Sequence, residues 1–281
     1  MKASYCIPKE NLQAFMKGAA MNNQYGIQFF ALAEPEAAAR ALPPPLELLD
    51  PENPVLYGYV VNIREPSFAP WYMEGGIGLM ARFEKTAGLY FLGLMLSGPG
   101  ALMGAFTGRE SSGLPKKLCE RIRVDRLDDE AHCCIERHGV RLLDVKLRMG
   151  QYNDSAFRTE QEGCTPDKPI TSHGNCLLHK YQLGQKGFYD MHLLQYDSAT
   201  RFCSWEPAEA EISLASSPDD PWASVPIRRI LGGGVMVSDN WVRSLSNLYK
   251  YPDEDLPDAM QRLFSGRYDQ CTLLKNHQWY E

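Results

Sequence analysis

The feature that most constrains this chain is a long run without charge. No charged residue occurs between Lys85 and Arg109, and about 20 uncharged residues are enough to cross a bilayer as a helix. The run is interrupted at residues 97–100 by the sequence Ser-Gly-Pro-Gly, and glycine and proline are typical of turns. We therefore predict two buried β-strands, residues 89–96 and 101–107, around a tight turn.

The rest of the chain also reads mainly as β-strands, because short β-branched or aromatic runs alternate with turn residues. Many short strands at close spacing favour a barrel or a sandwich. Helices are predicted at residues 8–21, where an apolar stripe includes Leu12 and Met16, at residues 34–41 before a proline run, and after Asp255 near the C-terminus. The predicted class is α+β, mainly β, with strands at residues 55–63, 78–83, 89–96, 101–107, 140–149, 177–183 and 191–196.

The charge and cysteine content exclude several kinds of partner. Lys and Arg number 29 against 35 Asp and Glu, a net charge of −6, so no broad cationic face is available for phosphates, and we expect neither nucleic acid nor a membrane as partner. Eight cysteines without a leading apolar segment favour a cytoplasmic protein with reduced thiols.

No composition shift divides residues 1–281, so we expect a single domain. Metal-ligand types occur at Cys164, His173, Cys176 and His179, but without a C-x-x-C pair we predict no metal site.

The most informative segment is GRESSGLPKKL, residues 108–118. Its Gly-Leu-Pro sequence predicts a turn just before Lys116 and Lys117. A Lys-Lys pair is normally a solvated surface feature, but this one follows two apolar predicted strands. A lysine held in an apolar site loses hydration, which lowers its pKa from about 10.4. The neutral amine can then condense with a ketone to form an iminium, which accepts the electron pair left by a departing carboxylate.

Two elements of the sequence resemble the acetoacetate decarboxylase family: the Gly-Arg-Glu…Pro-Lys-Lys-Leu segment at residues 108–118 and the Tyr-x-Glu-Gly element at residues 72–75. Acetoacetate decarboxylase is the standard example of a lysine activated by desolvation or by a neighbouring cation. The resemblance implies that Lys116 is the Schiff-base nucleophile, Lys117 its perturbing neighbour and Glu74 an acid/base group. It also implies a closed antiparallel β-barrel with helices packed outside, no cofactor, and assembly into a homo-oligomer.

The sequence departs from the family pattern at two positions. That pattern has an arginine before the first strand and a second acidic residue fifteen positions before the retained glutamate, where this chain has Gln24 and Tyr59. The site would thus lack a cation for a substrate carboxylate and an anion near the iminium. Aromatic and thioether side chains, including Met103, indicate an extended apolar ligand. The predicted substrate-binding residues are Tyr59, Trp71, Tyr72, Met95, Arg109 and Glu110, the last two as an ion pair at the edge of the site or as a structural clamp of the turn.

Three functions follow from this pattern. The first is a Schiff-base lyase that decarboxylates a β-keto acid or polyketide-like carbonyl compound through an iminium on Lys116. The second keeps the Schiff base but performs aldol, dehydration or cyclisation chemistry, as a site without a carboxylate-binding arginine could do. The third is a barrel that binds a hydrophobic ligand without catalysis. Borohydride trapping of a substrate adduct separates the third function from the first two, and release of carbon dioxide separates the first from the second.

Overall fold

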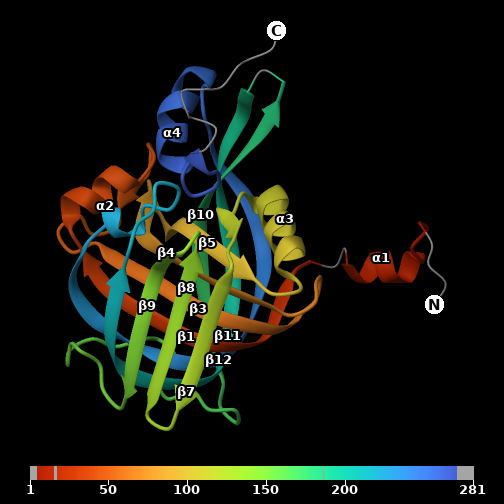
Figure 1. Cartoon of the computed structure of the whole chain (residues 1–281). Helices are drawn as coiled ribbons and strands as arrows, with labels where there is room; N and C mark the ends of the chain where they lie inside the picture. Colours follow the sequence, from red (N-terminus) through yellow and green to blue (C-terminus); the bar gives the residue numbers. More distant parts are fainter. Residues whose placement is uncertain (1–4, 16–17, 186, 271–281) are drawn as a thin grey trace.

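The protein is built around one twelve-stranded sheet (Figure 1). The computed structural model describes residues 5–15, 18–185 and 187–270. Buried and less buried side chains alternate along much of a strand such as β3, which is the two-residue repeat of a sheet with one covered face. The strands are β1 (Ala20–Ala33), β2 (Glu47–Leu48), β3 (Val55–Pro66), β4 (Tyr72–Phe83), β5 (Thr86–Ser97), β6 (Lys116–Leu118), β7 (Arg121–Leu127), β8 (Glu130–Arg137), β9 (Val140–Met149), β10 (Ile170–Gly184), β11 (Gly187–Leu214) and β12 (Ile227–Lys250).

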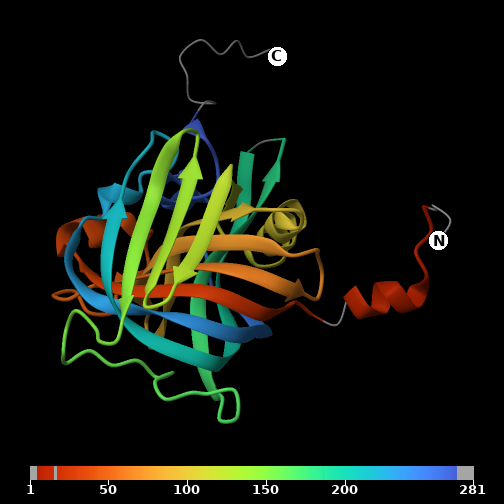
Figure 2. The ribbon, with the colours of Figure 1, turned by 60° about the horizontal axis from the view of Figure 1, so that its bottom comes forward.

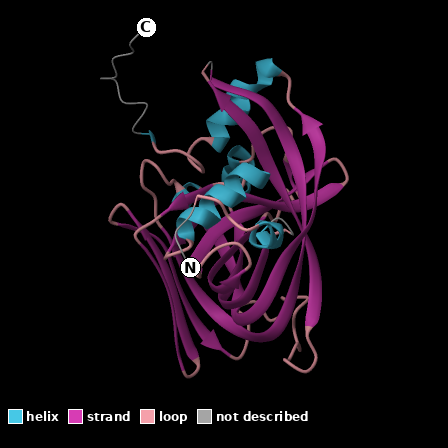
Figure 3. Cartoon of the chain, turned by 90° about the vertical axis from the view of Figure 1, so that its right-hand side faces the viewer, coloured by secondary structure: helices cyan, strands magenta, loops and turns pink. Residues whose placement is uncertain are grey.

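The strand order is β10-β5-β4-β3-β1-β12-β11-β9-β8-β7, with β2 paired to β4 and β6 paired to β5. Most neighbours are antiparallel, but β10–β5 and β5–β6 are parallel, so the expectation of a purely antiparallel sheet is wrong. β10 also pairs with β11, and long bent strands curl the sheet around an interior (Figure 3). The mainly-β class is confirmed. Closure into a barrel depends on the single pair of Cys176 with Leu89 and stays a prediction.

Helices are few and short. They are α1 (Lys9–Phe15), α2 (Pro35–Ala41), α3 (Ala101–Ser112) and α4 (Leu256–Leu263), together with the 3-10 turns η1 (Trp222–Ser224) and η2 (Asp253–Asp255). The predictions of a helix before the proline run and of a C-terminal helix after Asp255 are confirmed by α2 and α4. In the described part of the chain, no helix is long and apolar enough to cross a membrane.

The N-terminal helix is shorter than predicted. It ends at Phe15, and β1 begins at Ala20 because pairing with both β3 and β12 supplies backbone hydrogen bonds from there on. The expected helix over residues 8–21 is therefore wrong in its second half, and Met16 lies outside the described residues. Figures 1 and 2 show α1 standing away from the sheet, and Leu12 is exposed rather than packed.

The segment after the turn at residues 97–100 is the helix α3, so the strand predicted at residues 101–107 is wrong. Small residues at helical spacing form its buried face, and their size lets it pack closely against β4 and β5. The larger side chains face outward, and among them Met103 does not line an apolar site. The buried face comprises Ala101, Gly104, Ala105 and Gly108.

Apolar side chains fill three clusters that join the sheet to the helices. In one of them Ile135 and Val145 from β8 and β9 pack against Ile77 of β4. The thiols of Cys119, Cys133, Cys134, Cys164, Cys176 and Cys203 are free. Burial, with a smaller contribution from neighbouring groups, raises the pKa of the Cys133 thiol well above its ordinary value. Cys133 is thus an unreactive part of the core.

His179 makes the stability of this fold depend on pH. The ring is fully buried, and its Nε2 hydrogen-bonds the Tyr251 hydroxyl at 2.8 Å, which in turn donates to the Pro44 carbonyl. Burial, reinforced by the charge of Arg267, lowers the pKa of His179 well below its ordinary value, so the folded state keeps the ring neutral. The unfolded chain binds a proton here below about pH 6.5, so we expect the free energy of unfolding to fall as pH drops below that value.

Urea denaturation at several pH values checks this prediction. Between the pKa of the unfolded and of the folded ring, the unfolding equilibrium constant should rise by up to about tenfold per pH unit lost because of this residue. His179→Gln retains a polar side chain but cannot titrate, so its stability should fall less steeply with acid. An identical slope in both proteins would contradict the assignment.

Candidate active site

A cavity of about 1060 Å³ lies inside the curled sheet. Strands β1, β3, β4, β5, β6, β10, β11 and β12 contribute to its wall, together with helix α3 and the loop between β9 and β10. This volume and a largely apolar wall are typical of a site for an extended organic ligand. The aromatic part of the wall consists of Phe30, Tyr57, Phe91, Phe157, Tyr196 and Phe202.

Three polar side chains meet at this wall: Lys116, Glu74 and Tyr59. The Lys116 Nζ lies 2.6 Å from Glu74 Oε2, and the Tyr59 hydroxyl donates to Glu74 Oε1 at 2.6 Å. Lys116 is 3% exposed and Glu74 is 5% exposed, so both charges are almost fully removed from bulk water. Burial, with the neighbouring Glu74 charge, raises the pKa of Tyr59 well above its ordinary value. Tyr59 therefore remains a hydroxyl donor, and one carboxylate serves both an amine and a phenol.

The position of Lys116 follows from the short segment before it. α3 ends at Gly113, whose φ of 76° lies in the left-handed region that glycine adopts readily. The chain then turns back and pairs β6 with β5, so that Lys116 stands beside Leu94. Gly108 of α3 packs on the lysine stem: a Cβ there would lie 2.9 Å from Lys116 Cε. The helix thus holds the side chain along a path that a larger residue would obstruct.

Comparison with known proteins shows the family of this chain. Residues 5–252 match the acetoacetate decarboxylase family. The chain belongs to the acetoacetate decarboxylase family. It is also 33% identical over 274 residues, 95% of each protein, to a protein of Lactiplantibacillus plantarum described as "CLA biosynthesis isomerase". The family resemblance in the sequence is therefore confirmed.

Solved structures share the fold of this acetoacetate decarboxylase family member at low sequence identity. The acetoacetate decarboxylase of Legionella pneumophila superposes with a TM-score of 0.70 at 15% identity, covering 89% of this chain and 99% of that one. The enduracididine biosynthesis enzyme MppR, crystallised with the condensation product of pyruvate and imidazole 4-carboxaldehyde, gives a TM-score of 0.62 at 12% identity, covering 82% and 87%. Identities this low establish a common fold and nothing further.

Lys117 does not accompany Lys116 into the cavity. Successive side chains of a strand point to opposite faces, and Lys117 Nζ lies 2.9 Å from Asp220 Oδ1 and 3.1 Å from Asp269 Oδ1. Arg137 contacts the same two carboxylates at 2.6 and 2.7 Å. The expectation that Lys117 perturbs its neighbour from inside the site is wrong, because β6 separates the two ammonium groups and carboxylates balance the charge of Lys117.

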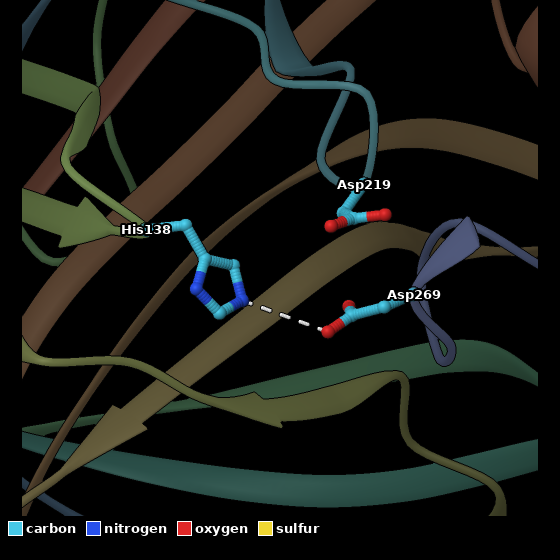
Figure 4. A group of neighbouring side chains, drawn as sticks. All are labelled: His138, Asp219 and Asp269. Atoms are coloured by element: carbon cyan, nitrogen blue, oxygen red, sulfur yellow. Dashed lines mark ion pairs between the residues drawn. The ribbon is translucent and has the colours of Figure 1, made fainter. Parts of the chain in front are cut away.

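A group of possible metal ligands lies beside this ion-pair network (Figure 4). His138, Asp219 and Asp269 place one ligand atom each within 4.8 Å of the others. Burial alone would raise the pKa of Asp269, but hydrogen bonds from Arg137 and Lys117 lower it to about 2. Asp269 is thus a carboxylate already bound to two protein cations, and Asp219 accepts a backbone N–H at 2.6 Å. We therefore assign Asp269 to the ion-pair network and Asp219 to a hydrogen bond with the backbone of Gln270.

Three of the predicted substrate-binding residues lie outside the cavity wall. Trp71 is 47% exposed and borders a separate shallow hollow. Tyr72 is fully buried beneath α3, where its ring would contact a Cβ at Gly104. Met95 follows Leu94 along β5, so it points to the opposite face, where it packs into the core. The apolar character of these residues is evident from the sequence. Which face of the sheet Tyr72 and Met95 occupy depends on the position of each residue along its strand.

Arg109 and Glu110 do not form the predicted ion pair, and the alternative role of a turn clamp fits Arg109. Arg109 donates from Nη1 to the Lys116 carbonyl at 3.3 Å and lies over the Tyr268 ring. It is therefore a clamp on the turn rather than a wall residue. Glu110 is exposed, and no ion pair between the two forms in the part of the chain that the structure describes. Tyr59 is the predicted substrate-binding residue that does line the cavity.

Several polar residues of the cavity wall were not predicted from the sequence. Gln28 and Gln161 line the cavity beside Gln24, and His173 and Tyr196 come from β10 and β11. The two glutamines of β1 are four residues apart and so share one face of the strand. Had residues 20–33 been predicted as a strand, this spacing would have indicated that both side chains face the same side of the sheet. Gln161 lies in an irregular loop, where no periodicity exists to be read. The four residues considered as zinc ligands do not converge, since His179 is buried against Tyr251 while His173 lines the cavity.

Proposed function

We propose that the protein is a Schiff-base isomerase that moves a carbon–carbon double bond into conjugation with the ketone of a long apolar substrate. The observation that carries this proposal is the placement of one buried carboxylate, Glu74, between the Lys116 amine and the Tyr59 hydroxyl at an apolar wall. Such a carboxylate can move a proton within the site without exchanging it with bulk water.

The first stage forms the iminium. Glu74 accepts a proton from the Lys116 ammonium, and the freed amine adds to the ketone carbon to give a carbinolamine. Glu74 then gives this proton to the carbinolamine hydroxyl, which leaves as water, so that an iminium C=N bond to the lysine forms and Glu74 is again a carboxylate. The 2.6 Å separation of Lys116 Nζ from Glu74 Oε2 is within hydrogen-bond distance for the proton transfer.

The second stage moves the double bond. The iminium acidifies the carbon between it and a β,γ double bond, and Glu74 removes a proton from that carbon, so that the electron pair forms a neutral dienamine. A proton returned to the γ-carbon shifts the double bond to the α,β position and restores the iminium. Water then releases the conjugated ketone and regenerates Lys116. Substrate and product have the same atoms, and Tyr59 holds the carboxylate in place through its hydrogen bond.

Two observations favour isomerisation over decarboxylation. The relative with 33% identity is described as an isomerase. In addition, the two guanidinium groups among the described wall residues, Arg158 and Arg243, are both exposed, while Gln24 and Gln28 present neutral amides. A substrate carboxylate beside Glu74 would therefore be repelled, with Lys116 as the buried cation available to offset that repulsion.

Decarboxylation of a β-keto acid on Lys116 remains the second candidate, because the family match and the same lysine support it. Non-catalytic binding of a hydrophobic ligand is the third, supported by the apolar wall. The three candidates differ in their products: a conjugated ketone, carbon dioxide with a shortened ketone, or no change in the ligand.

One experiment in deuterated water tests the proposal. A nine-carbon methyl ketone with a β,γ double bond is incubated with the protein, and the ultraviolet absorbance of the conjugated ketone is followed. We expect conjugation in which the γ-carbon receives the hydrogen taken from the α-carbon and little deuterium, and loss of this activity in Lys116→Met. A ten-carbon β-keto acid is supplied in parallel. Carbon dioxide release from the acid without conjugation of the ketone would reject isomerisation in favour of decarboxylation, and no reaction of either would favour ligand binding.

A further inference from the structure

Two buried amides form a polar feature in the cavity wall. Gln28 of β1 is 7% exposed and Gln161 of the β9–β10 loop is 5% exposed, and both line the cavity. Gln161 Nε2 donates to Gln28 Oε1 at 3.1 Å. We call these two residues the amide pair.

The amide pair does not satisfy its own hydrogen-bonding groups. Each glutamine amide carries two N–H donors and an oxygen that accepts. After the one bond between them, Gln28 Nε2 and Gln161 Oε1 have no partner among the described residues. Buried polar groups are normally paired, because leaving them unpaired costs free energy. Because both residues line the cavity, one donor and one acceptor are available there to a ligand that completes the bonding.

The amide pair lies beside the reactive groups. Gln28 is paired directly with Tyr59 across β1 and β3, and directly opposed side chains have Cβ atoms about 5 Å apart. Tyr59 in turn bonds Glu74, which contacts Lys116. A substrate joined to Lys116 would thus carry its next few carbons past the amide pair.

We propose that the amide pair is a subsite for a hydroxyl group on the substrate, a few carbons from the ketone that reacts with Lys116. A hydroxyl accepts from Gln28 Nε2 and donates to Gln161 Oε1, so it satisfies both groups at once. A ketone oxygen can only accept, and a carboxylate would place negative charge against the Gln161 oxygen. This inference rests on the proposed function for the identity of the reacting ketone, and it adds the second functional group by which the substrate is selected.

The test measures binding without covalent chemistry. In the Lys116→Met background, which cannot form a Schiff base, isothermal titration calorimetry gives the Kd of 2-nonanone and of its three analogues with one hydroxyl on carbon 4, 5 or 6. We expect at least one analogue to bind about tenfold more tightly than 2-nonanone, as two added hydrogen bonds would produce. Because the lysine is absent, this result does not depend on whether the wild-type protein isomerises, decarboxylates or only binds its ligand.

Matched substitutions locate the effect. Adding Gln161→Met or Gln28→Met keeps the side-chain size but removes the amide, and each should bring the analogue and 2-nonanone to within about twofold of one another. Gln24→Met, at an equally buried glutamine on the same face of β1, should leave the preference for the hydroxyl in place. Equal Kd values for all four ketones, or a preference that survives both amide-pair substitutions, would overturn the proposal. If one variant fails to fold, the other decides the question.

Discussion

Replacing Lys116 with methionine is expected to abolish covalent trapping and to lower turnover at least about a thousandfold. The reason is that the amine is the nucleophile of every catalytic route considered, and removal of a nucleophile commonly costs more than any single supporting group. The measurement combines borohydride reduction in the presence of a methyl ketone with peptide mapping by mass spectrometry. The wild-type protein should carry a reduced ketone adduct at residue 116.

Lys116→Arg is the matched control for charge. It keeps a cation opposite Glu74 but lacks a nucleophilic amine at neutral pH, so it should be as inactive as Lys116→Met while folding more normally. A wild-type adduct mapped to another lysine would contradict the role of the Lys116 amine as nucleophile. Turnover retained in Lys116→Arg would contradict it as well, and would indicate that the charge opposite Glu74 is what the reaction requires.

Replacing Asp220 with alanine is expected to lower the free energy of unfolding by about 3–5 kcal/mol. This carboxylate is 1% exposed and accepts from both Lys117 and Arg137. Its removal leaves two buried cations that share the remaining Asp269, and an uncompensated buried charge is far more costly than the loss of an exposed pair. The measurement is urea denaturation followed by circular dichroism.

Asp167→Asn provides the control, because this carboxylate is exposed in a loop, and it should change the free energy of unfolding by less than about 0.5 kcal/mol. Asp220→Ala should in addition weaken the β6 segment on which the reactive lysine stands, so any residual activity should decay faster on warming. A loss similar to that of the loop variant would mean that the network is not a principal support of the fold.

The sequence predicted those parts of the molecule that depend on local chemistry. Helix α2 stops before a proline run and α4 begins after Asp255, and both follow from rules that involve neighbouring residues only. Lys116 and Glu74 were identified from short motifs, and their 2.6 Å contact accords with the expectation that they act together. The catalytic roles themselves stay predictions.

What the sequence could not supply is which face a residue occupies and which distant residues meet. The strand expected at residues 101–107 is a helix because small residues recur at helical spacing, a weak signal within an apolar run. Met95 was assigned to the site although strand alternation turns it into the core. Asp220 and Asp269 lie more than a hundred positions after Lys117 in the sequence, and no local sequence pattern predicts that they contact it.

The pairing of β6 with β5 chooses between two chemically identical amines. Leu94 stands beside Lys116 and Met95 beside Lys117, so a slip of this pairing by a single position would turn each side chain to the opposite face. If Lys117 moved into the position beside Leu94, its amine would enter the cavity, and Lys116 would leave it. Deleting one residue between Gly113 and Lys116, with Lys117 retained, would thus bring Lys117 to the position of the reactive amine. The register of β6 against β5, and not the residue type, determines which lysine is the nucleophile.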